Sequence, residues 1–297
     1  MKNNSPQLLY IAGPTASGKT ALALAIAQHY QTEILSCDSR QFYREMKIGT
    51  APPSSDELAR VPHHFIHHRS LSDTYNVGAF EREALEVLEQ LFKKHAIVIM
   101  VGGSGLYADA VLEGFDHFPE VPEAIRQQLE MYYQAHGIDS LQEMLRKEDP
   151  DHYARVDRQN PQRLLRALGV TITASKPYSS FLGKTKKTRP FGTKVMVLDL
   201  DREVLYQRID QRVDRMIAAG LEAEANALQP FQDHPAFRTV GYQEWIPFWE
   251  GQCDRETVIE TIKRNSRRYA KRQITWFKKY GAANFYPADA PFNTFLR

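Results

Sequence analysis

Residues 13–20 read Gly-Pro-Thr-Ala-Ser-Gly-Lys-Thr, which fits the pattern G-x-x-x-x-G-K-[ST]. Glycines in this pattern let backbone N–H groups turn onto phosphate oxygens, and Lys19 adds a positive charge. The Thr20 hydroxyl is the group that would ligate Mg²⁺. The segment therefore predicts a site for a diphosphate or polyphosphate group, built by Gly13, Pro14, Thr15, Ala16, Ser17, Gly18, Lys19 and Thr20.

The polar segment Cys-Asp-Ser-Arg-Gln at residues 37–41 follows a short stretch at 33–36 that is expected to be a strand. In a parallel sheet the carboxyl ends of the strands meet at the ligand-binding edge, so we expect Asp38 to face the phosphate loop. A carboxylate there can accept a proton or bind Mg²⁺, but an Asp in this place can also be a helix cap or a turn residue.

Acidic residues are missing where a nucleotide hydrolase usually needs one. The apolar stretch 97–101 ends in Gly-Gly-Ser-Gly instead of a carboxylate that would hold Mg²⁺. Asp199 and Asp201 follow another apolar stretch, but they precede a helical pattern and are better interpreted as its caps.

Four histidines, His63, His64, His67 and His68, have spacings that could bring two of them onto one helical face. A metal site is one interpretation and a loop of hydrogen-bonded histidines is the other. Pro62 precedes the group and no acidic or cysteine ligand is near, which favours the loop.

Cations gather in two places. Arg208, Arg212 and Arg215 recur at the spacing of one helical face, where one guanidinium could clamp a diphosphate or all could be solvated. Residues 263–280 hold eight Lys and Arg and no acid, so the net charge of +2 leaves −6 for the rest of the chain. Aromatic residues interleave with these cations, which is typical either of nucleic-acid binding or of an amphipathic helix with core-facing aromatics.

The elements that must position these groups alternate along the chain. Strand-like stretches at 7–12, 33–36, 96–101 and 194–200 alternate with helical patterns, including one at 77–95, which predicts a parallel α/β sheet. Between Gly114 and Pro190 the pattern is helical only, near 122–135, 139–147 and 161–174. We therefore predict a phosphate-loop α/β core from residues 1–114 and 191–297, with an all-helical insertion at 115–190.

Composition narrows the class of protein. The 297 residues are 42% hydrophobic and 25% charged, which is ordinary for a globular chain and excludes disordered, collagenous and disulfide-scaffold proteins. We find no apolar run long enough to span a bilayer and no signal peptide, and Cys37 and Cys253 are isolated, so a reduced cytoplasmic setting is expected.

Taken together, eight segments resemble the tRNA dimethylallyltransferase family, also called tRNA isopentenyltransferases. They run in the family's order over nearly the whole chain, at residues 13–20, 38–51, 61–65, 101–107, 160–168, 208–216, 240–244 and 267–277. Such enzymes transfer a dimethylallyl group from dimethylallyl diphosphate to N6 of adenine 37, beside the tRNA anticodon, and release diphosphate with the help of Mg²⁺.

The resemblance implies a role for particular residues. Asp38 would be the base on the adenine amine, and Thr15, Lys19, Thr20 and Arg212 would surround the diphosphate. Positions that line the tRNA contact correspond to Asp38, Ser39, Arg40, Gln41, Ser104, Arg126, Gln162, Arg163, Leu164, Leu165 and Arg166. The helical insertion would embrace the anticodon stem-loop, and a monomer is expected.

The chain departs from the family pattern at three places. Ser104 and Ser266 stand where threonine is usual, and Gly169 replaces a common glutamate. Three other functions use some of the same features: a phosphate-loop kinase of small molecules, an adenylate isopentenyltransferase acting on free nucleotide, and an RNA-binding protein without catalysis. The missing acidic strand end, the basic segment and Asp38 argue against each in turn.

Overall fold

The computed structural model describes residues 5–116, 118–183 and 188–296, and the chain divides into two compact units. The first unit combines Met1–Leu112 with Arg189–Arg297, and the second is Glu113–Thr188. The chain therefore leaves the first unit once, completes the second and returns to the first.

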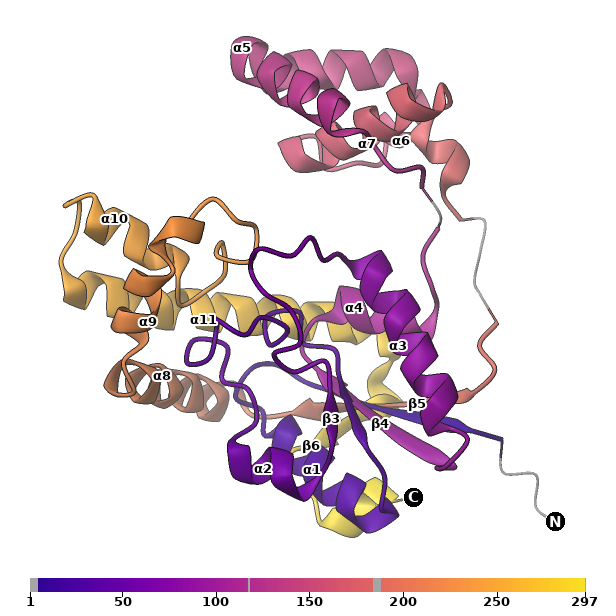
Figure 1. Ribbon diagram of the computed structural model, residues 1–297, viewed down its shortest axis with the longest axis vertical. Coiled ribbons are helices and arrows are strands. Elements are labelled where there is room, and N and C mark those ends of the chain that lie inside the picture. The colour runs from indigo at the N-terminus through magenta and orange to yellow at the C-terminus, as the bar shows by residue number, and fades with distance from the viewer. Residues whose placement is uncertain (1–4, 117, 184–187, 297) are drawn as a thin grey trace. The chain divides into compact units, whose positions relative to one another are not determined.

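The first unit is built on a six-stranded sheet with the order β3-β2-β4-β1-β5-β6 (Figure 1). All pairings between neighbouring strands are parallel. Ala12 lies opposite Gly102 and Ser36 opposite Val101, so three central strands end at the same edge. The strands are β1 Gln7–Ala12, β2 Ile34–Ser36, β3 His63–His64, β4 Ile97–Gly102, β5 Gly192–Asp199 and β6 Phe285–Pro287.

Both faces of this sheet are buried. Successive side chains of a strand point to opposite faces, and alternate residues of β1 belong to two different cores. Leu8 and Tyr10 of β1 belong to a core that includes helices α3, Val77–Leu91, and α4, Gly105–Leu112. Leu9 and Ile11 belong to a second core on helix α1, Lys19–Tyr30. The short helix α2, Ser55–Arg60, begins with a capping box between Ser54 and Glu57.

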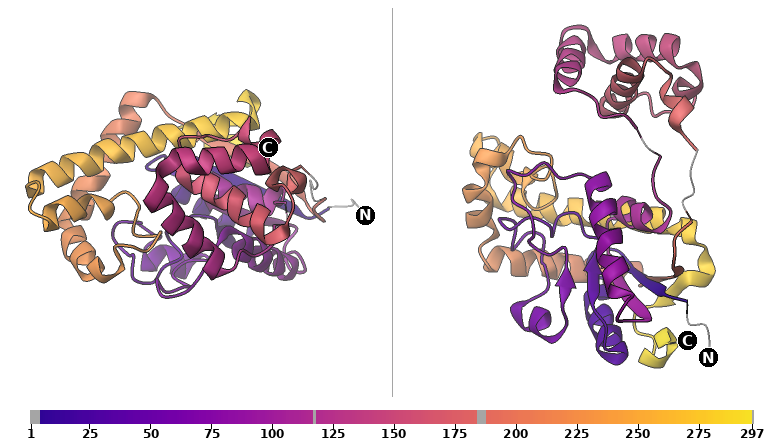
Figure 2. Two further views of the ribbon diagram at one scale, coloured as in Figure 1. Left: turned by 90° about the horizontal axis from the view of Figure 1, so that it is seen from above. Right: turned by 45° about the vertical axis from the view of Figure 1, so that its right-hand side comes forward.

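After β5 the first unit is mainly helical (Figure 2). The longest elements are α8, Arg202–Ala218, and α11, Arg255–Phe277, which pack against each other. Between them lie α9, Leu221–Ala227, and α10, Ile246–Trp249, and short 3₁₀ turns occur at Gln229–Phe231 and Gln243–Trp245. Further 3₁₀ turns at Lys278–Tyr280, Ala282–Asn284 and Phe292–Leu296 accompany β6.

The second unit is entirely helical in its described residues. It consists of α5, Glu123–Glu148, α6, Pro150–Tyr153, α7, Pro161–Ala174, and a 3₁₀ turn at Tyr178–Phe181. Its core is formed by Leu129, Leu141, Leu145, Leu164, Ala167, Leu168, Val170 and Tyr178. Asp149, which is buried, accepts hydrogen bonds from His152 N and from the backbone and hydroxyl of Ser179, and so ties α6 to the 3₁₀ turn.

The structure also explains one departure from the family pattern. Gly169 lies on the buried face of α7, where an added Cβ would already come within 3.1 Å of Val121 Cγ1. A glutamate at this position would therefore need the neighbouring side chains to move.

The expected α/β class is confirmed, and four of the six strands match the predicted stretches closely. The two helices expected near 122–135 and 139–147 are present as the two parts of α5, which are separated at Gly137, whose φ of 74° and ψ of −177° are not helical. Strands β3 and β6 were missed because two- and three-residue edge strands carry no periodicity. Both cysteines are free, and among the described residues we find no helix both long and apolar enough to cross a membrane.

Candidate active site

The phosphate loop joins β1 to α1 with an irregular backbone. Ala16 and Gly18 have φ values of 63° and 91°, in the left-handed region that glycine adopts readily and alanine does not. Gly13 approaches Ser17 so closely that an added Cβ would lie 2.6 Å from Ser17 Oγ. The sequence pattern therefore produces a tight turn in which Gly13 permits a close approach to Ser17 and Gly18 a left-handed backbone, while Ala16 adopts a conformation unusual for a residue with a side chain.

The start of α1 is left without a protein cap. Gly18 supplies no side-chain hydrogen bond, and the first turn of the helix holds no acidic residue. The first N–H groups of a helix have no partner within the helix, and they carry partial positive charge. An anion in front of Lys19 and Thr20 would satisfy them, which is how helix N-termini bind phosphate groups.

Lys19 lies in an environment that makes its charge responsive to pH. Its Nζ donates a hydrogen bond to Pro14 O at 3.2 Å. Burial lowers the pKa of Lys19 to about 8, Asp38 opposes this shift and Arg212 adds to it. A bound anion would restore the charged form, because it adds a negative partner in a site of low polarity.

Asp38 follows β2, as expected, and lines the same pocket as Lys19 and Thr20. One carboxylate oxygen, Oδ1, accepts a hydrogen bond from Arg40 N at 3.2 Å. The charge of Asp38 also acts on both Lys19 and Arg212. The carboxylate therefore faces the phosphate loop and two cations across one pocket.

Of the three arginines that the sequence singled out on α8, Arg208, Arg212 and Arg215, only Arg212 lines the pocket. Arg208 and Arg215 are exposed, whereas Arg212 is half-buried and places Nη2 3.5 Å from Thr50 O. Burial lowers the pKa of Arg212, and Asp38 opposes this. One guanidinium thus lies in the pocket with Lys19 and Asp38, and the other two are exposed.

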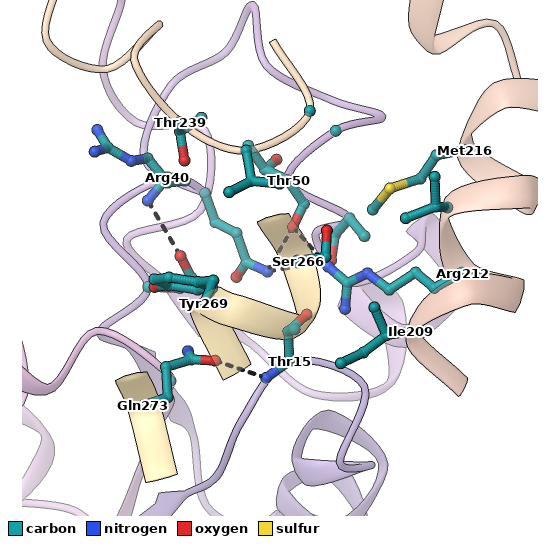
Figure 3. A pocket seen from close by; sticks show the side chains of 18 of the residues that line it. Thr15, Arg40, Thr50, Ile209, Arg212, Met216, Thr239, Ser266, Tyr269 and Gln273 are labelled. Carbon is teal, nitrogen blue, oxygen red and sulfur yellow. Dashed lines mark hydrogen bonds between the residues drawn. The ribbon is translucent and has the colours of Figure 1, made fainter. Parts of the chain in front are cut away.

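Helix α11 supplies a wall of the pocket through Ile262, Ser266, Tyr269 and Gln273 (Figure 3). Burial raises the pKa of Tyr269 to about 12, and the nearby charge of Asp38 adds to this effect. Gln273 Oε1 accepts a hydrogen bond from Thr15 N at 2.9 Å, so the helix contacts the phosphate loop directly.

Three of the eight loop residues predicted around the diphosphate line this pocket, together with Arg212, Asp38 and two residues that follow Asp38, whereas Gly13, Pro14, Ala16, Ser17 and Gly18 do not line it. Thr15, Lys19, Thr20, Asp38, Arg40, Gln41 and Arg212 line it. Ser39 and Ser104 lie beside it and contact each other, because Ser104 Oγ accepts a hydrogen bond from Ser39 N at 3.1 Å and lies 3.1 Å from Ser39 Oγ. The serine at position 104 thus keeps a hydroxyl in contact with the segment after β2.

Two loops that line the pocket were not predicted as site residues. Gly49, Thr50 and Ala51 form one side, and Gln41 Nε2 donates to Ala51 O at 3.1 Å. Thr239, Val240 and Gly241 form another part of the lining. Both loops lie in or next to segments that resemble the family, but their residue types do not by themselves indicate a catalytic or binding role. Apolar side chains complete the pocket, at Val101, Ile209, Val213, Met216 and Ile262.

The four histidines do not form a metal site. No group of three or more His, Cys, Asp and Glu able to hold a metal occurs in the described part of the chain. His63 and His64 form β3 instead of a loop, and His64 Nε2 hydrogen-bonds Glu33 at 2.7 Å. His68 does not make the expected hydrogen bonds, because neither ring nitrogen has a partner among the residues that the structure describes. Its ring packs against Phe42 and Phe65, and burial lowers its pKa to about 4.

The basic segment divides into paired and unpaired cations. Lys263, Arg267 and Lys279 form ion pairs with Asp214, Asp210 and Asp109 respectively. The five others are exposed and have no acidic partner among the described residues; we call them the basic stripe, and they are Arg264, Arg268, Lys271, Arg272 and Lys278. Their spacing places most of them on the face of α11 opposite the pocket residues.

The aromatic residues of this segment behave differently from one another. Phe277 is fully buried and Tyr280 is half-buried, with its hydroxyl donating to Asp109 at 2.9 Å. Trp276 is 41% exposed, and Tyr269 lines the pocket. The segment is therefore an amphipathic helix whose outer face remains cationic.

The predicted RNA-contact residues of the second unit fall into two groups. Arg126, Gln162, Arg163 and Arg166 are exposed, and Arg166 lies over the ring of Phe118 at 5.3 Å. Leu164 is fully buried in the core of this unit and Leu165 packs against that core. The side chain of Leu164 therefore supports the helix and leaves the polar residues around it to face solvent.

Fold and pocket together define a phosphate-loop α/β protein whose pocket is lined by the loop, a carboxylate, an arginine and several apolar side chains. Residues 41–280 match the model of the IPP transferase family. The chain therefore belongs to the IPP transferase family.

Curated relatives and solved structures agree with this assignment. The chain is 50% identical over 278 residues to a tRNA dimethylallyltransferase of Flavobacterium psychrophilum, covering 92% of this chain and 91% of the relative. It is 51% identical over 275 residues to that of Christiangramia forsetii, covering 93% and 91%. A tRNA isopentenylpyrophosphate transferase of Bacillus halodurans has a similar structure, with a TM-score of 0.70 and 34% identity over 97% of this chain and 92% of that one.

A eukaryotic dimethylallyltransferase whose structures follow its action on tRNA is also similar, with a TM-score of 0.78 and 27% identity over 95% of this chain and 73% of that one. The phosphate-loop α/β fold predicted for this chain is thus the fold of its structural relatives.

Proposed function

We propose that this protein transfers a dimethylallyl group from dimethylallyl diphosphate to N6 of an adenine beside the tRNA anticodon, position 37, and releases diphosphate. The observation that carries the proposal is the pocket itself, in which Asp38, Lys19 and Arg212 face one another beside an uncapped helix N-terminus. The names of its relatives add the acceptor and the transferred group.

The phosphate loop and Arg212 bind the diphosphate and stabilise the charge that builds on it as the allylic carbon–oxygen bond breaks. The backbone N–H groups at the start of α1 and the cations of Lys19 and Arg212 are already oriented before the reaction. Such preorganised groups stabilise developing charge effectively because they need no reorganisation when the bond breaks. The apolar side chains of Ile209, Val213 and Met216 offer the five-carbon group a surface without competing water.

The donor set fits Mg²⁺ bound together with substrate. Thr20 offers a hydroxyl in the pocket, while the described residues hold no cluster able to bind a metal alone. Mg²⁺ characteristically uses one or two protein oxygens plus substrate phosphates and water. When bound, it would neutralise charge on the departing diphosphate.

Asp38 acts as the base. The exocyclic amine of adenine is a poor nucleophile because its lone pair is delocalised into the ring, so proton removal during bond formation accelerates the reaction. A positioned carboxylate contributes about 10²–10⁴-fold in this way. The hydrogen bond from Arg40 N to Oδ1 orients Asp38 and leaves Oδ2 for the amine proton.

In our proposal the acceptor is RNA, because each of the two units exposes a group of cations. The basic stripe lies on the outer face of the helix whose inner face lines the pocket, and the second unit exposes Arg126, Arg163 and Arg166. Phosphate contacts of this kind give affinity without sequence reading. The adenine must leave its stack to reach Asp38, which costs about a few kcal/mol and least in a loop. We expect a monomer acting in the cytoplasm, where tRNA is modified.

One assay separates this function from its rivals. Unmodified tRNA and AMP are offered as acceptors with Mg²⁺ and dimethylallyl diphosphate labelled in the allyl group, and ATP labelled in its terminal phosphate is offered in parallel. Label should enter tRNA, with AMP modified far more slowly and no phosphorylated product from ATP. Preferential labelling of AMP would indicate an adenylate isopentenyltransferase, and phosphoryl transfer from ATP would indicate a kinase.

A further inference from the structure

The side chain of Gln273 is buried between two loops that end neighbouring strands. Its exposed fraction is 6%, and both ends of its amide are used. Oε1 accepts a hydrogen bond from Thr15 N in the phosphate loop at 2.9 Å, and Nε2 donates one to Gly103 O in the loop after β4 at 2.9 Å. Figure 3 shows the first of these bonds beside the pocket.

The position between Thr15 N–H and Gly103 C=O requires a side chain that both accepts and donates a hydrogen bond, as an amide does. The backbone ladder between β1 and β4 ends where Ala12 lies opposite Gly102, and the two loops separate beyond it. Thr15 N–H and Gly103 C=O would then be a donor and an acceptor without partners inside the protein, which is unfavourable. The Gln273 amide carries one group of each kind at a fixed spacing, and so it links the two loops as a peptide group would.

A glycine at position 103 leaves space for the amide of Gln273. A Cβ added to Gly103 would lie 2.2 Å from Gln273 Nε2, so position 103 must lack a side chain for the amide to enter. Trp276 lies about one turn after Gln273 on α11, and a Cβ added to Gly105 would lie 2.3 Å from the ring of Trp276. Two residues three apart on α11 thus contact the loop after β4, at Gly103, and the first residue of α4, Gly105.

We propose that Gln273 is a positioning residue of the transfer reaction, which fixes the phosphate loop at Thr15 against the loop after β4 and against α11. The inference rests on the proposed function, since it concerns the geometry of the same diphosphate site. Thr15 lines the pocket beside Lys19, so a change in its backbone moves the groups that hold the diphosphate. A misplacement of catalytic groups by about 1 Å can cost about 10²-fold in rate.

The test exploits the chemistry of glutamate. In Gln273→Glu, an ionised carboxylate still accepts from Thr15 N–H but repels Gly103 C=O. A protonated carboxyl accepts from one group and donates to the other, as glutamine does. Because burial next to a carbonyl oxygen raises the pKa of a carboxyl, the variant should recover as the pH falls.

We expect kcat/KM for dimethylallyl diphosphate to fall at least ~10-fold in Gln273→Glu at pH 8 and the ratio to wild type to rise several-fold by pH 6. The KM for tRNA should change less than twofold. Gln232→Glu, the same substitution at an exposed position, should follow wild type at every pH. Gly103→Ala, which pushes the amide away without altering Gln273, should lower kcat/KM in the same direction without recovery at low pH.

Melting temperatures measured at both pH values separate positioning from stability. If Gln273→Glu folds at pH 8 and equals wild type in kcat and KM, or its loss is not recovered at pH 6, the proposal is overturned. If it does not fold at pH 8, Gly103→Ala decides: a folded Gly103→Ala protein with wild-type kcat/KM overturns the proposal. Absence of transfer by the wild-type protein would instead reject the proposed function.

Discussion

At the scale of single residues, the pocket combines groups whose charges depend on one another. Lys19 and Arg212 are both drawn toward their neutral forms by burial, and Asp38 counteracts this for both. The free pocket is therefore poised to gain stability from an anion, because a bound diphosphate supplies the negative charge that two cations share.

The first prediction concerns the titration of Lys19. Its pKa lies near 8 in the free protein, so it is charged below that pH and loses its proton as the pH rises through it. The affinity for dimethylallyl diphosphate should therefore fall as the pH rises above 8, by up to about tenfold per pH unit. The measurement is kcat/KM for this substrate between pH 7 and 9.

Lys19→Arg is the matched variant, because arginine remains charged throughout this range. Its kcat/KM can be lower than that of wild type but should be flat between pH 7 and 9. A wild-type profile as flat as that of Lys19→Arg would show that Lys19 does not titrate in the free pocket.

At the scale of elements, a carboxylate on α9 holds a loop that lines the pocket. Glu224 accepts hydrogen bonds from Ile48 N and Gly49 N at distances down to 2.8 Å and 3.0 Å, and from Tyr242 Oη at 2.7 Å. Gly49 lies so close to Tyr242 that an added Cβ would be 2.6 Å from its ring. These contacts fix the backbone of Thr50, next in the chain, against which Gln41 and Arg212 are oriented.

The second prediction is a loss of stability in Glu224→Gln. The amide keeps one acceptor but loses the charge and presents N–H groups to backbone N–H donors, so the free energy of unfolding should fall by about 1.5–3 kcal/mol. Glu222→Gln on the same helix removes only a partly exposed pair with Arg255 and should cost less than about 1 kcal/mol. Urea unfolding measures both; equal losses would refute the special role of Glu224.

The third prediction concerns α11 and its basic stripe. Each phosphate neutralised by a cation releases counterions, so RNA affinity should depend steeply on salt. Arg264→Ala/Arg268→Ala/Lys271→Ala should weaken binding of an anticodon stem-loop and flatten the salt slope by about one unit per lost phosphate contact. These three residues are chosen because they have no acidic partner among the described residues. Lys279, in contrast, forms an ion pair with Asp109, and its removal would disturb the fold.

A variant with Lys93→Ala and Lys94→Ala, which removes exposed cations after α3, is the control. It should leave the slope unchanged, and both variants should retain the wild-type KM for dimethylallyl diphosphate. A slope in the stripe variant identical to that of wild type would exclude α11 from the RNA surface.

The sequence predicted some elements of the site and not others, for physical reasons. The phosphate loop was predictable because its turn requires glycine at positions 13 and 18, and Asp38 was predictable because strand ends in a parallel sheet converge. Gln273 was not, because a glutamine among cations and aromatics carries no signal until its helix is placed against two loops. Glu224 and Gly49 were missed likewise, since they lie far apart in sequence and meet only in the folded chain.

At the scale of the whole molecule, the chain is divided into two compact units. The first contains the pocket and the basic stripe, and the second is a helical unit with its own core and exposed arginines. We expect chemistry to depend on the first unit and selection of tRNA to depend on both.

The central claim is that the pocket at Asp38 forms a bond between a dimethylallyl group and the adenine beside the anticodon. The direct measurement is mass spectrometry of the nucleosides of unmodified tRNA after incubation with dimethylallyl diphosphate and wild type, Asp38→Asn or Asp201→Asn. Asp201 caps α8, and asparagine preserves that role, so this variant is the matched control.

Wild type and Asp201→Asn should yield N6-dimethylallyladenosine at the adenine beside the anticodon and nowhere else. Asp38→Asn should form it at least ~10²-fold more slowly while it binds tRNA and diphosphate normally. Modification at another nucleoside, or an Asp38→Asn rate close to that of wild type, would contradict the account.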